Sequence, residues 1–190
     1  MKETEVTVEV FDSFEKVNET LLGMGFEVTE RYVIYDRYFS GEKNVAALSY
    51  AELMKGSVLV RRIDADKRTD QLIYKNKEID SRGTVLSEEK VKTSLGNADD
   101  AAAILALSGL NQYCEITNRS TVYAKGNVCF ALQDVDGLGL FIEYEEDGSM
   151  KDLPPDVKIE RLTGVLKSLG LSLGSNRSCK KVFMKLHKKQ

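Results

Sequence analysis

The stretch NVCFALQDVDGLGLFIEYE, Asn127 to Glu145, decides the fold. Two apolar, β-prone runs flank a Gly-Leu-Gly turn, and the second run carries Glu143 and Glu145 two residues apart. Because side chains alternate along a strand, both carboxylates project from one face. The amino terminus repeats the arrangement, with Glu3 and Glu5 in KETEVTVEV. These aligned carboxylates indicate a face built for a cation, although the solvated side of two ordinary strands is the commoner explanation of spacing alone.

Composition bounds the class of protein. The 190 residues suit one domain with a substantial core, so we expect a single domain spanning 1–190. A net charge of −3 calls for neither nucleic acid nor a membrane surface as partner. The three cysteines, Cys114, Cys129 and Cys179, are widely spaced and form no CxxC motif. They indicate reduced thiols, and we expect a cytoplasmic protein.

Strands dominate the expected elements. The expected strands are 6–10, 28–39, 57–65, 71–78, 83–93, 113–125, 127–133 and 140–146. Helices are expected at 14–24, 98–107, 154–169 and 178–188, with a short helix inside 40–56. Asp12 and Glu15 resemble a capping pair for the helix 14–24, and Asn97 is expected to cap the helix 98–107. Because short turns favour antiparallel neighbours and closure removes exposed edges, we predict an α+β fold with a closed eight-stranded antiparallel barrel and flanking helices.

Basic residues stand in the same apolar runs as the acids. They are Arg61, Lys75, Lys77 and Arg119. Inside a closed barrel such charges must be paired, hydrated or bound to a ligand, because isolated buried charge is too costly. Arginine and lysine suit phosphate oxygens, and carboxylates suit a divalent ion such as Mg²⁺. The mixture of signs therefore predicts a polyanion bound together with a metal. The basic tail 178–188 is expected to be a solvated helix that packs Val182, Phe183 and Leu186 on the barrel.

Nearly the whole chain resembles the CYTH domain family, the triphosphate-tunnel fold. The resemblance is carried by Glu3-x-Glu5, Asp36-Arg37-Tyr38-Phe39, the Arg61 strand, Tyr74-Lys75 and Gly137-Leu138-Gly139-x-Phe141-x-Glu143-x-Glu145. It implies a tunnel in which bases grip a triphosphate and acids bind Mg²⁺ or Mn²⁺. The implied metal ligands are Glu3, Glu5, Glu143 and Glu145. The implied phosphate-binding residues are Arg61, Lys75, Lys77 and Arg119. The implied catalytic residues are Glu3, Glu5, Lys75 and Glu143. A further tunnel acid is matched by Glu89, with Glu88 as the competing register.

The chain departs from the family pattern at several site positions. Thr7 replaces the lysine of Glu-x-Glu-x-Lys, and Leu59 replaces the first of two arginines. Thr117 stands where a lysine is common, Gln133 replaces an aspartate, and a Ser-Tyr pair reads Ser178-Cys179. Each lost charged contact to phosphate is worth about 1.5–3 kcal/mol, so these changes weaken triphosphate binding.

Three hypotheses remain open from the sequence. The first is an enzyme: a metal-dependent phosphohydrolase acting on a small-molecule triphosphate or short polyphosphate, with Mg²⁺ or Mn²⁺, or alternatively a class IV-type adenylyl cyclase. The second is a non-catalytic module that binds a phosphorylated ligand. The third is a barrel whose charges face solvent and bind nothing. Hydrolysis ranks above cyclisation, because no residue in the sequence is identified as a base for the ribose hydroxyl.

Overall fold

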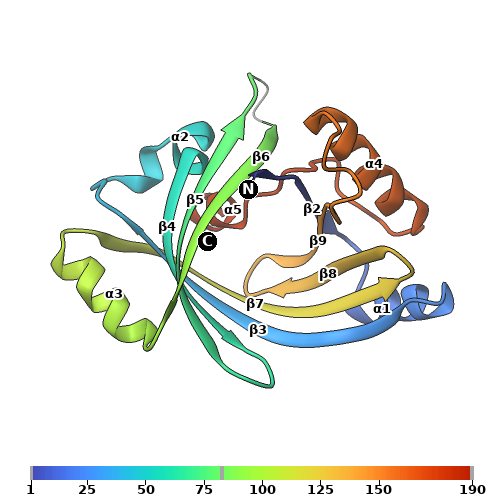
Figure 1. Cartoon of the computed structure of the whole chain (residues 1–190), viewed down its shortest axis with the longest axis horizontal. Helices are drawn as coiled ribbons and strands as arrows, with labels where there is room; N and C mark the ends of the chain where they lie inside the picture. Colours follow the sequence, from blue (N-terminus) through green and yellow to red (C-terminus); the bar gives the residue numbers. More distant parts are fainter. Residues whose placement is uncertain (1, 82–83, 189–190) are drawn as a thin grey trace.

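One antiparallel sheet organises the chain. The computed structural model describes residues 2–81 and 84–188, and the side chains of residues 2, 3, 54 and 55 lie outside that description. Within these ranges the strand order is β1-β6-β5-β4-β3-β7-β8-β9-β2 (Figure 1). The strands are β1 (Lys2–Glu3), β2 (Glu5–Val10), β3 (Glu27–Ser40), β4 (Gly56–Asp64), β5 (Thr69–Ile79), β6 (Val85–Leu95), β7 (Asn111–Lys125), β8 (Val128–Val135) and β9 (Gly139–Glu145). The expected strands are confirmed in order, although Gly83, an expected strand start, lies outside the described residues.

The sheet curls into a deep half-barrel and does not close fully, so the prediction of a closed barrel was wrong in that respect (Figure 1). β6 pairs with β1 only through Lys2 and Glu3, while β2 pairs with β9 along its length. From Thr7 onward the outer edge of β2 is bonded to the carboxy-terminal segment, through Thr7 N to Arg177 O (3.1 Å) and Cys179 N to Thr7 O (3.0 Å). Because those backbone groups are already satisfied, β6 cannot extend its ladder along β2.

Alternation separates the two faces of the sheet. Val6 and Val8 on β2 are fully buried in a core that lies outside the curl, between the sheet and two helices. Those helices are α1 (Phe14–Gly23) and α4 (Pro155–Ser168), which supply Leu21 and Leu162. Glu5 and Thr7, which alternate with these valines along β2, must therefore face the hollow.

The turn between β8 and β9 depends on glycine. Gly137 (φ +76°) and Gly139 (φ +104°) adopt left-handed backbone conformations that residues with a Cβ adopt only with strain. Leu138 N donates to Val135 O (2.9 Å), which closes the turn. The turn returns the chain antiparallel and sets the register that brings Glu143 opposite Ala131.

The remaining helices cover the outside and one end of the curl. They are η1 (Val45–Ala47), α2 (Tyr50–Lys55), α3 (Ala98–Leu107) and α5 (Lys181–His187). Asn97 caps α3 as expected, but α1 is capped by Ser13, whose hydroxyl accepts from Lys16 N (3.3 Å), and not by Asp12. Asp12 instead forms an ion pair with Lys16 at 2.5 Å. Among the described residues, no helix is both long and apolar enough to cross a membrane.

The carboxy-terminal helix is shorter than expected. α5 begins at Lys181, and Ser178 to Lys180 are extended, because Ser178 forms a parallel bridge with Thr7 of β2. The expected packing of Val182, Phe183 and Leu186 is confirmed, since all three join Ile116 and Phe141 in one apolar cluster. α5 thus covers the apolar end of the hollow, which lies behind the sheet in Figure 1.

Candidate active site

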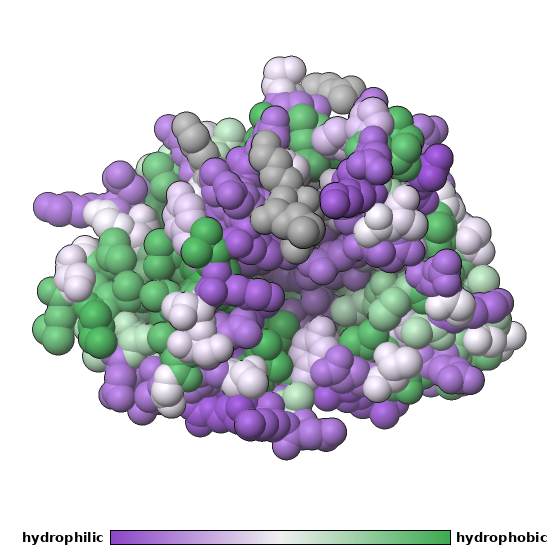
Figure 2. Space-filling model, viewed as in Figure 1, coloured by the Kyte–Doolittle hydropathy of each residue, from purple (hydrophilic) through white to green (hydrophobic). Residues whose placement is uncertain are grey.

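A cavity of about 340 Å³ occupies the concave face of the sheet. Its walls come from β2, β3, β4, β5, β7, β8 and β9, and from the start of α5. Figure 2 shows the corresponding hollow in the middle of this face, with hydrophilic residues at its floor. Residues from many strands therefore meet in one space, as expected for side chains that point into a curled sheet.

Three carboxylates converge at the β2–β9 side of the cavity. Glu5 is directly opposite Glu145 in the register, and Glu143 is opposite Thr7. Carboxylate oxygens of Glu5, Glu143 and Glu145 all lie within 4.8 Å of one another. Hard oxygen donors at this spacing fit a divalent ion such as Mg²⁺ or Mn²⁺. The side chain of Glu3, the fourth expected ligand, lies outside the described part of the chain.

Lysines surround Glu5. Its side chain is only 8% exposed, and its oxygens lie 3.4 Å from Lys180 Nζ and 3.7 Å from Lys90 Nζ. Burial opposes the ionisation of Glu5, but the surrounding ammonium groups outweigh burial and hold its pKa well below the usual value. These groups belong, in decreasing order of effect, to Lys180, Lys77, Lys75 and Lys90. Glu5 is therefore a carboxylate at neutral pH despite its burial.

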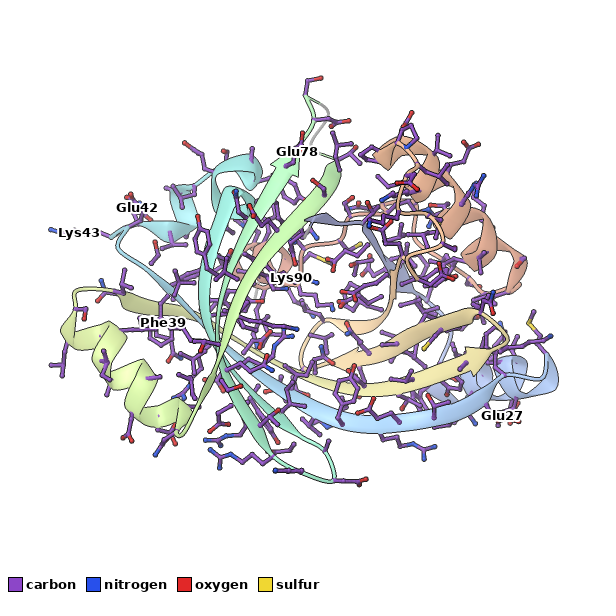
Figure 3. The ribbon with its side chains drawn as sticks, in the orientation of Figure 1. Glu27, Phe39, Glu42, Lys43, Glu78 and Lys90 are labelled. Carbon is purple, nitrogen blue, oxygen red and sulfur yellow. The ribbon has the colours of Figure 1, made fainter. Side chains whose placement is uncertain are left out.

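The other two acids have partners of their own. Lys181 Nζ donates to Glu143 Oε2 (3.0 Å) and also to the amide oxygen of Gln133. Burial raises the pKa of Glu143, but the charges of Lys181 and Lys75 and the hydrogen bond from Lys181 together outweigh burial, and the net pKa is lowered. Glu145 is half exposed and accepts from Lys90 Nζ at 2.9 Å. Lys90 extends from β6 toward the concave side of the sheet (Figure 3).

A further acid, Glu88, lies among the lysines of β5 and β6. Its side chain is 1% exposed, and its oxygens lie 3.3 Å from Lys75 Nζ and 3.4 Å from Lys90 Nζ. Lys77, its cross-strand partner, contacts it more closely still. Burial, and then the charge of Arg61, lowers the pKa of Lys75. Of the two alternatives left open by the sequence, Glu88 is the internal acid, since Glu89 is exposed.

Arg61 is fixed by an aspartate on the adjacent strand. Asp36 stands directly opposite Arg61 in the β3–β4 register. The guanidinium donates from Nε to Asp36 Oδ1 (2.7 Å) and from Nη2 to Oδ2 (2.6 Å). Burial disfavours the charged guanidinium, but Asp36 reverses this effect and the pKa of Arg61 is raised. Arg61 therefore presents a permanent positive charge to the cavity in a fixed orientation.

Arg119 is not brought to the cavity, so its expected place among the phosphate-binding residues is not what the structure shows. Its side chain is 54% exposed and forms an ion pair with Asp136. On β7, Ile116 and Asn118 line the cavity, so their neighbours Thr117 and Arg119 must point to the opposite face. The inward positions of this strand are one residue away from those that the family pattern implied.

Of the other positions at which this chain departs from the family pattern, some line the cavity and some do not. Thr7 (3% exposed) and Gln133 (2% exposed) both line the cavity, whereas Leu59 is fully buried. Two of the family's charged positions are therefore uncharged in the cavity itself. Ser178 and Cys179 lie beside Thr7, where Cys179 N donates to its carbonyl.

Several residues of the site were not predicted as such. They are Asp36, Lys90, Lys180 and Lys181, whereas Glu88 was one of the two expected positions of a further acid. Asp36 belongs to the motif Asp36-Arg37-Tyr38-Phe39, and the alternation of Glu88 and Lys90 is itself a strand signal. Lys180 and Lys181 had no such signal, because a basic run before an amphipathic helix is ordinarily solvent-exposed.

Comparisons with known proteins agree on one family. The CYTH domain family matches residues 1–175. A protein of Methanocaldococcus jannaschii, provisionally named an adenylate cyclase, is 26% identical over 173 residues, which cover 90% of this chain and 91% of that protein.

Solved structures share the fold. The PH1819 protein from Pyrococcus horikoshii superimposes with a TM-score of 0.77 at 19% identity, covering 98% of this chain and 99% of that one. A protein of Hippeastrum, provisionally named an adenylyl cyclase and described with a dominant triphosphatase activity, has a TM-score of 0.64 at 16% identity, with 96% and 94% coverage. At these identities the likeness shows the fold alone.

Proposed function

The chain belongs to the CYTH domain family, and from that premise we propose that it is a metal-dependent phosphohydrolase that cleaves a triphosphate or short polyphosphate. The observation that supports this proposal is the meeting of both charge signs in one cavity. Glu5, Glu143 and Glu145 converge on one side, and Lys75 and Arg61 line the same space. A groove for an anion alone would need no converging carboxylates, whereas an anion bound with its counter-cation needs both.

The acids of β2 and β9 are the proposed metal ligands. Glu5, Glu143 and Glu145 would hold Mg²⁺ or Mn²⁺, and Glu3 is retained as a proposed fourth ligand from the family pattern. A bound divalent ion supplies neutralisation of charge on phosphate oxygens. The lowered pKa values of Glu5 and Glu143 keep both groups ionised near neutral pH, which is the state that a metal requires.

The bases are the proposed phosphate-binding residues. Lys75, Lys77 and Arg61 come from two neighbouring strands and would contact the phosphate oxygens. There they would stabilise the negative charge of the phosphoryl group in the transition state, the main task of protein groups in phosphoryl transfer. Asp36 acts through Arg61, because two hydrogen bonds hold the guanidinium plane. Arg119 is left out of this set, since it points away from the cavity.

A binding module without turnover is the second candidate, and one observation favours it. Thr7 and Gln133 face the cavity at positions where the family pattern has charged residues. A charged contact that is lost at the reacting phosphate weakens the binding of the transition state more than that of the substrate. A tunnel that keeps its anion affinity but loses charge at the reacting centre would bind without catalysing.

Product analysis separates these functions. Phosphate and pyrophosphate release would be measured with tripolyphosphate, thiamine triphosphate and ATP, each with Mg²⁺, Mn²⁺ or EDTA. The hydrolase predicts metal-dependent phosphate release that Lys75→Met lowers at least tenfold, whereas Lys67→Met, in an exposed turn, has little effect. Pyrophosphate released from ATP together with a cyclic nucleotide would instead identify a cyclase. Ligand-induced thermal stabilisation with no product would support the binding module and rule out the hydrolase.

A further inference from the structure

The carboxy-terminal segment enters the cavity beside Thr7, the β2 position where the family pattern has a lysine. Thr7 is 3% exposed, faces the cavity, and is opposite Glu143 in the β2–β9 register. Both its backbone N–H and its carbonyl are bonded to the segment that ends in Lys181, through Arg177 O and Cys179 N. Tyr50 of α2 fixes the same segment from the other side, with its hydroxyl 2.9 Å from Ser178 O. The backbone that leads to Lys181 is therefore anchored to position 7 itself.

The anchored segment delivers one buried and one partly buried ammonium group. The side chains of Lys180 and Lys181 are 8% and 13% exposed, and both line the cavity. Lys181 Nζ bonds Glu143, the cross-strand neighbour of Thr7, and lies 5.8 Å from the centre of the Phe141 ring. Lys180 Nζ contacts Glu5, the residue two before Thr7 on the same face. Ordinary tail lysines remain in water, as the exposed Lys185 does one turn later on α5.

We infer that Lys181, assisted by Lys180, binds phosphate oxygens of the ligand and supplies from the carboxy terminus the positive charge that Thr7 cannot. This inference rests on the proposed function, because it needs a phosphorylated ligand in the cavity. Cations held close to Glu5 and Glu143 balance those carboxylates before a ligand arrives. Once a bound metal ion balances the carboxylates, the ammonium groups of Lys180 and Lys181 are free to contact an anion. They would do so close to β2, where the lysine of the family pattern would stand.

Moving the charge back to the strand tests the inference. The affinity for a non-hydrolysable imido analogue of tripolyphosphate would be measured by titration calorimetry with Mg²⁺ present, so that the carboxylates have a counter-ion and turnover does not interfere. Lys181→Met is expected to raise Kd by about 10- to 100-fold, the range of one lost charged hydrogen bond. Adding Thr7→Lys to that variant is expected to recover most of the loss, because the new ammonium group starts opposite Glu143. Lys185→Met, on the same helix, is the matched control and should change Kd less than twofold.

The rescue distinguishes ligand binding from a structural role. A purely structural Lys181 would give variants whose Kd does not respond to a lysine placed on β2. Should Lys181→Met fail to fold by circular dichroism, Lys181→Gln, which keeps a donor to Glu143 but has no charge, replaces it in the single and the double variant with the same expected changes in Kd. Wild-type affinity in Lys181→Met, or no recovery in the double variant, would overturn the inference while leaving the hydrolase intact. Absence of binding of this analogue by the wild-type protein, with EDTA or Mg²⁺, would overturn the proposed function and this inference together.

Discussion

At the scale of single residues, the cavity is a network in which each described acid has a lysine or arginine partner. Asp36 holds Arg61, Lys181 holds Glu143, and Lys90 contacts Glu145. Such pairing offsets the desolvation of charges that would otherwise be too costly to bury. It also positions cations for a ligand before the ligand arrives, because an ammonium group held at a carboxylate has already lost its water shell and its rotamer freedom.

The bidentate contact between Asp36 and Arg61 gives the first prediction. Asp36→Asn removes the charged acceptor of two hydrogen bonds, and we expect it to lower the free energy of unfolding by about 1.5–3 kcal/mol. Urea denaturation followed by fluorescence measures the change. Asp136→Asn is the matched control, because it breaks the exposed pair with Arg119 and should change stability much less. Equal losses of unfolding free energy in the two variants would show that the buried Asp36–Arg61 pair stabilises the fold no more than the exposed pair does.

The pKa of Glu5 gives a prediction about acid stability. Because folding lowers this pKa, the unfolded chain binds the proton more tightly than the folded one, and stability falls as pH drops below the ordinary glutamate value of about 4.3. Glu5→Gln cannot titrate there. We therefore expect the wild-type protein to be the more stable at pH 7 and the difference to shrink on acidification toward pH 3. Urea denaturation across this range measures it, and a constant difference would contradict the lowered pKa.

At the scale of elements, alternation along a strand decides which charges are internal. The apolar runs locate β7 from the sequence. The charged residues in such a run do not reveal which of the two alternating sets of side chains points into the cavity. Asn118 and Arg119 differ by one residue and lie on opposite faces, so a shift of one position exchanges the cavity lining for the surface. The carboxy-terminal segment shows a second limit. Ser178 to Lys180 are extended because Thr7 binds them, and a contact across 171 positions of sequence leaves no local signal.

The two faces of β6 provide the element-scale prediction. Glu88→Gln removes the charge at the centre of Lys75, Lys77 and Lys90, and we expect a loss of about 3–5 kcal/mol in the free energy of unfolding. Glu89→Gln, the adjacent change on the exposed face, should have little effect. Chemical denaturation of both variants under identical conditions measures the contrast. A Glu89 variant as unstable as the Glu88 variant would mean that the assigned faces are wrong.

At the scale of the whole molecule, the fold was predictable and its closure was not. The alternating runs around Glu5 and Glu143 predict an antiparallel sheet, and the Gly137–Gly139 turn predicts the hairpin of β8 and β9. Whether a curled sheet closes depends on which segment of the chain pairs with the edge strand, here β2. Here the carboxy-terminal segment binds that edge at Thr7, a competition that strand patterns cannot express. The same competition carries Lys180 and Lys181 into the cavity, so the error about closure and the failure to recognise these lysines have one cause.

Metal binding by the assembled cavity is the last prediction, since it requires strands from both ends of the chain to be in register. At a Mg²⁺ or Mn²⁺ concentration of 100 times Kd, binding to the folded state alone should raise the melting temperature by about 5–10 °C. Glu143→Gln with Glu145→Gln should abolish this rise, because only one described carboxylate of the cluster remains. The control is Glu27→Gln with Glu30→Gln, two exposed acids of β3 whose neutralisation should leave the rise unchanged. Differential scanning calorimetry measures all three proteins. An unaltered rise in the Glu143/Glu145 variant would place the metal elsewhere and remove the premise that the converging acids exist to bind a cation.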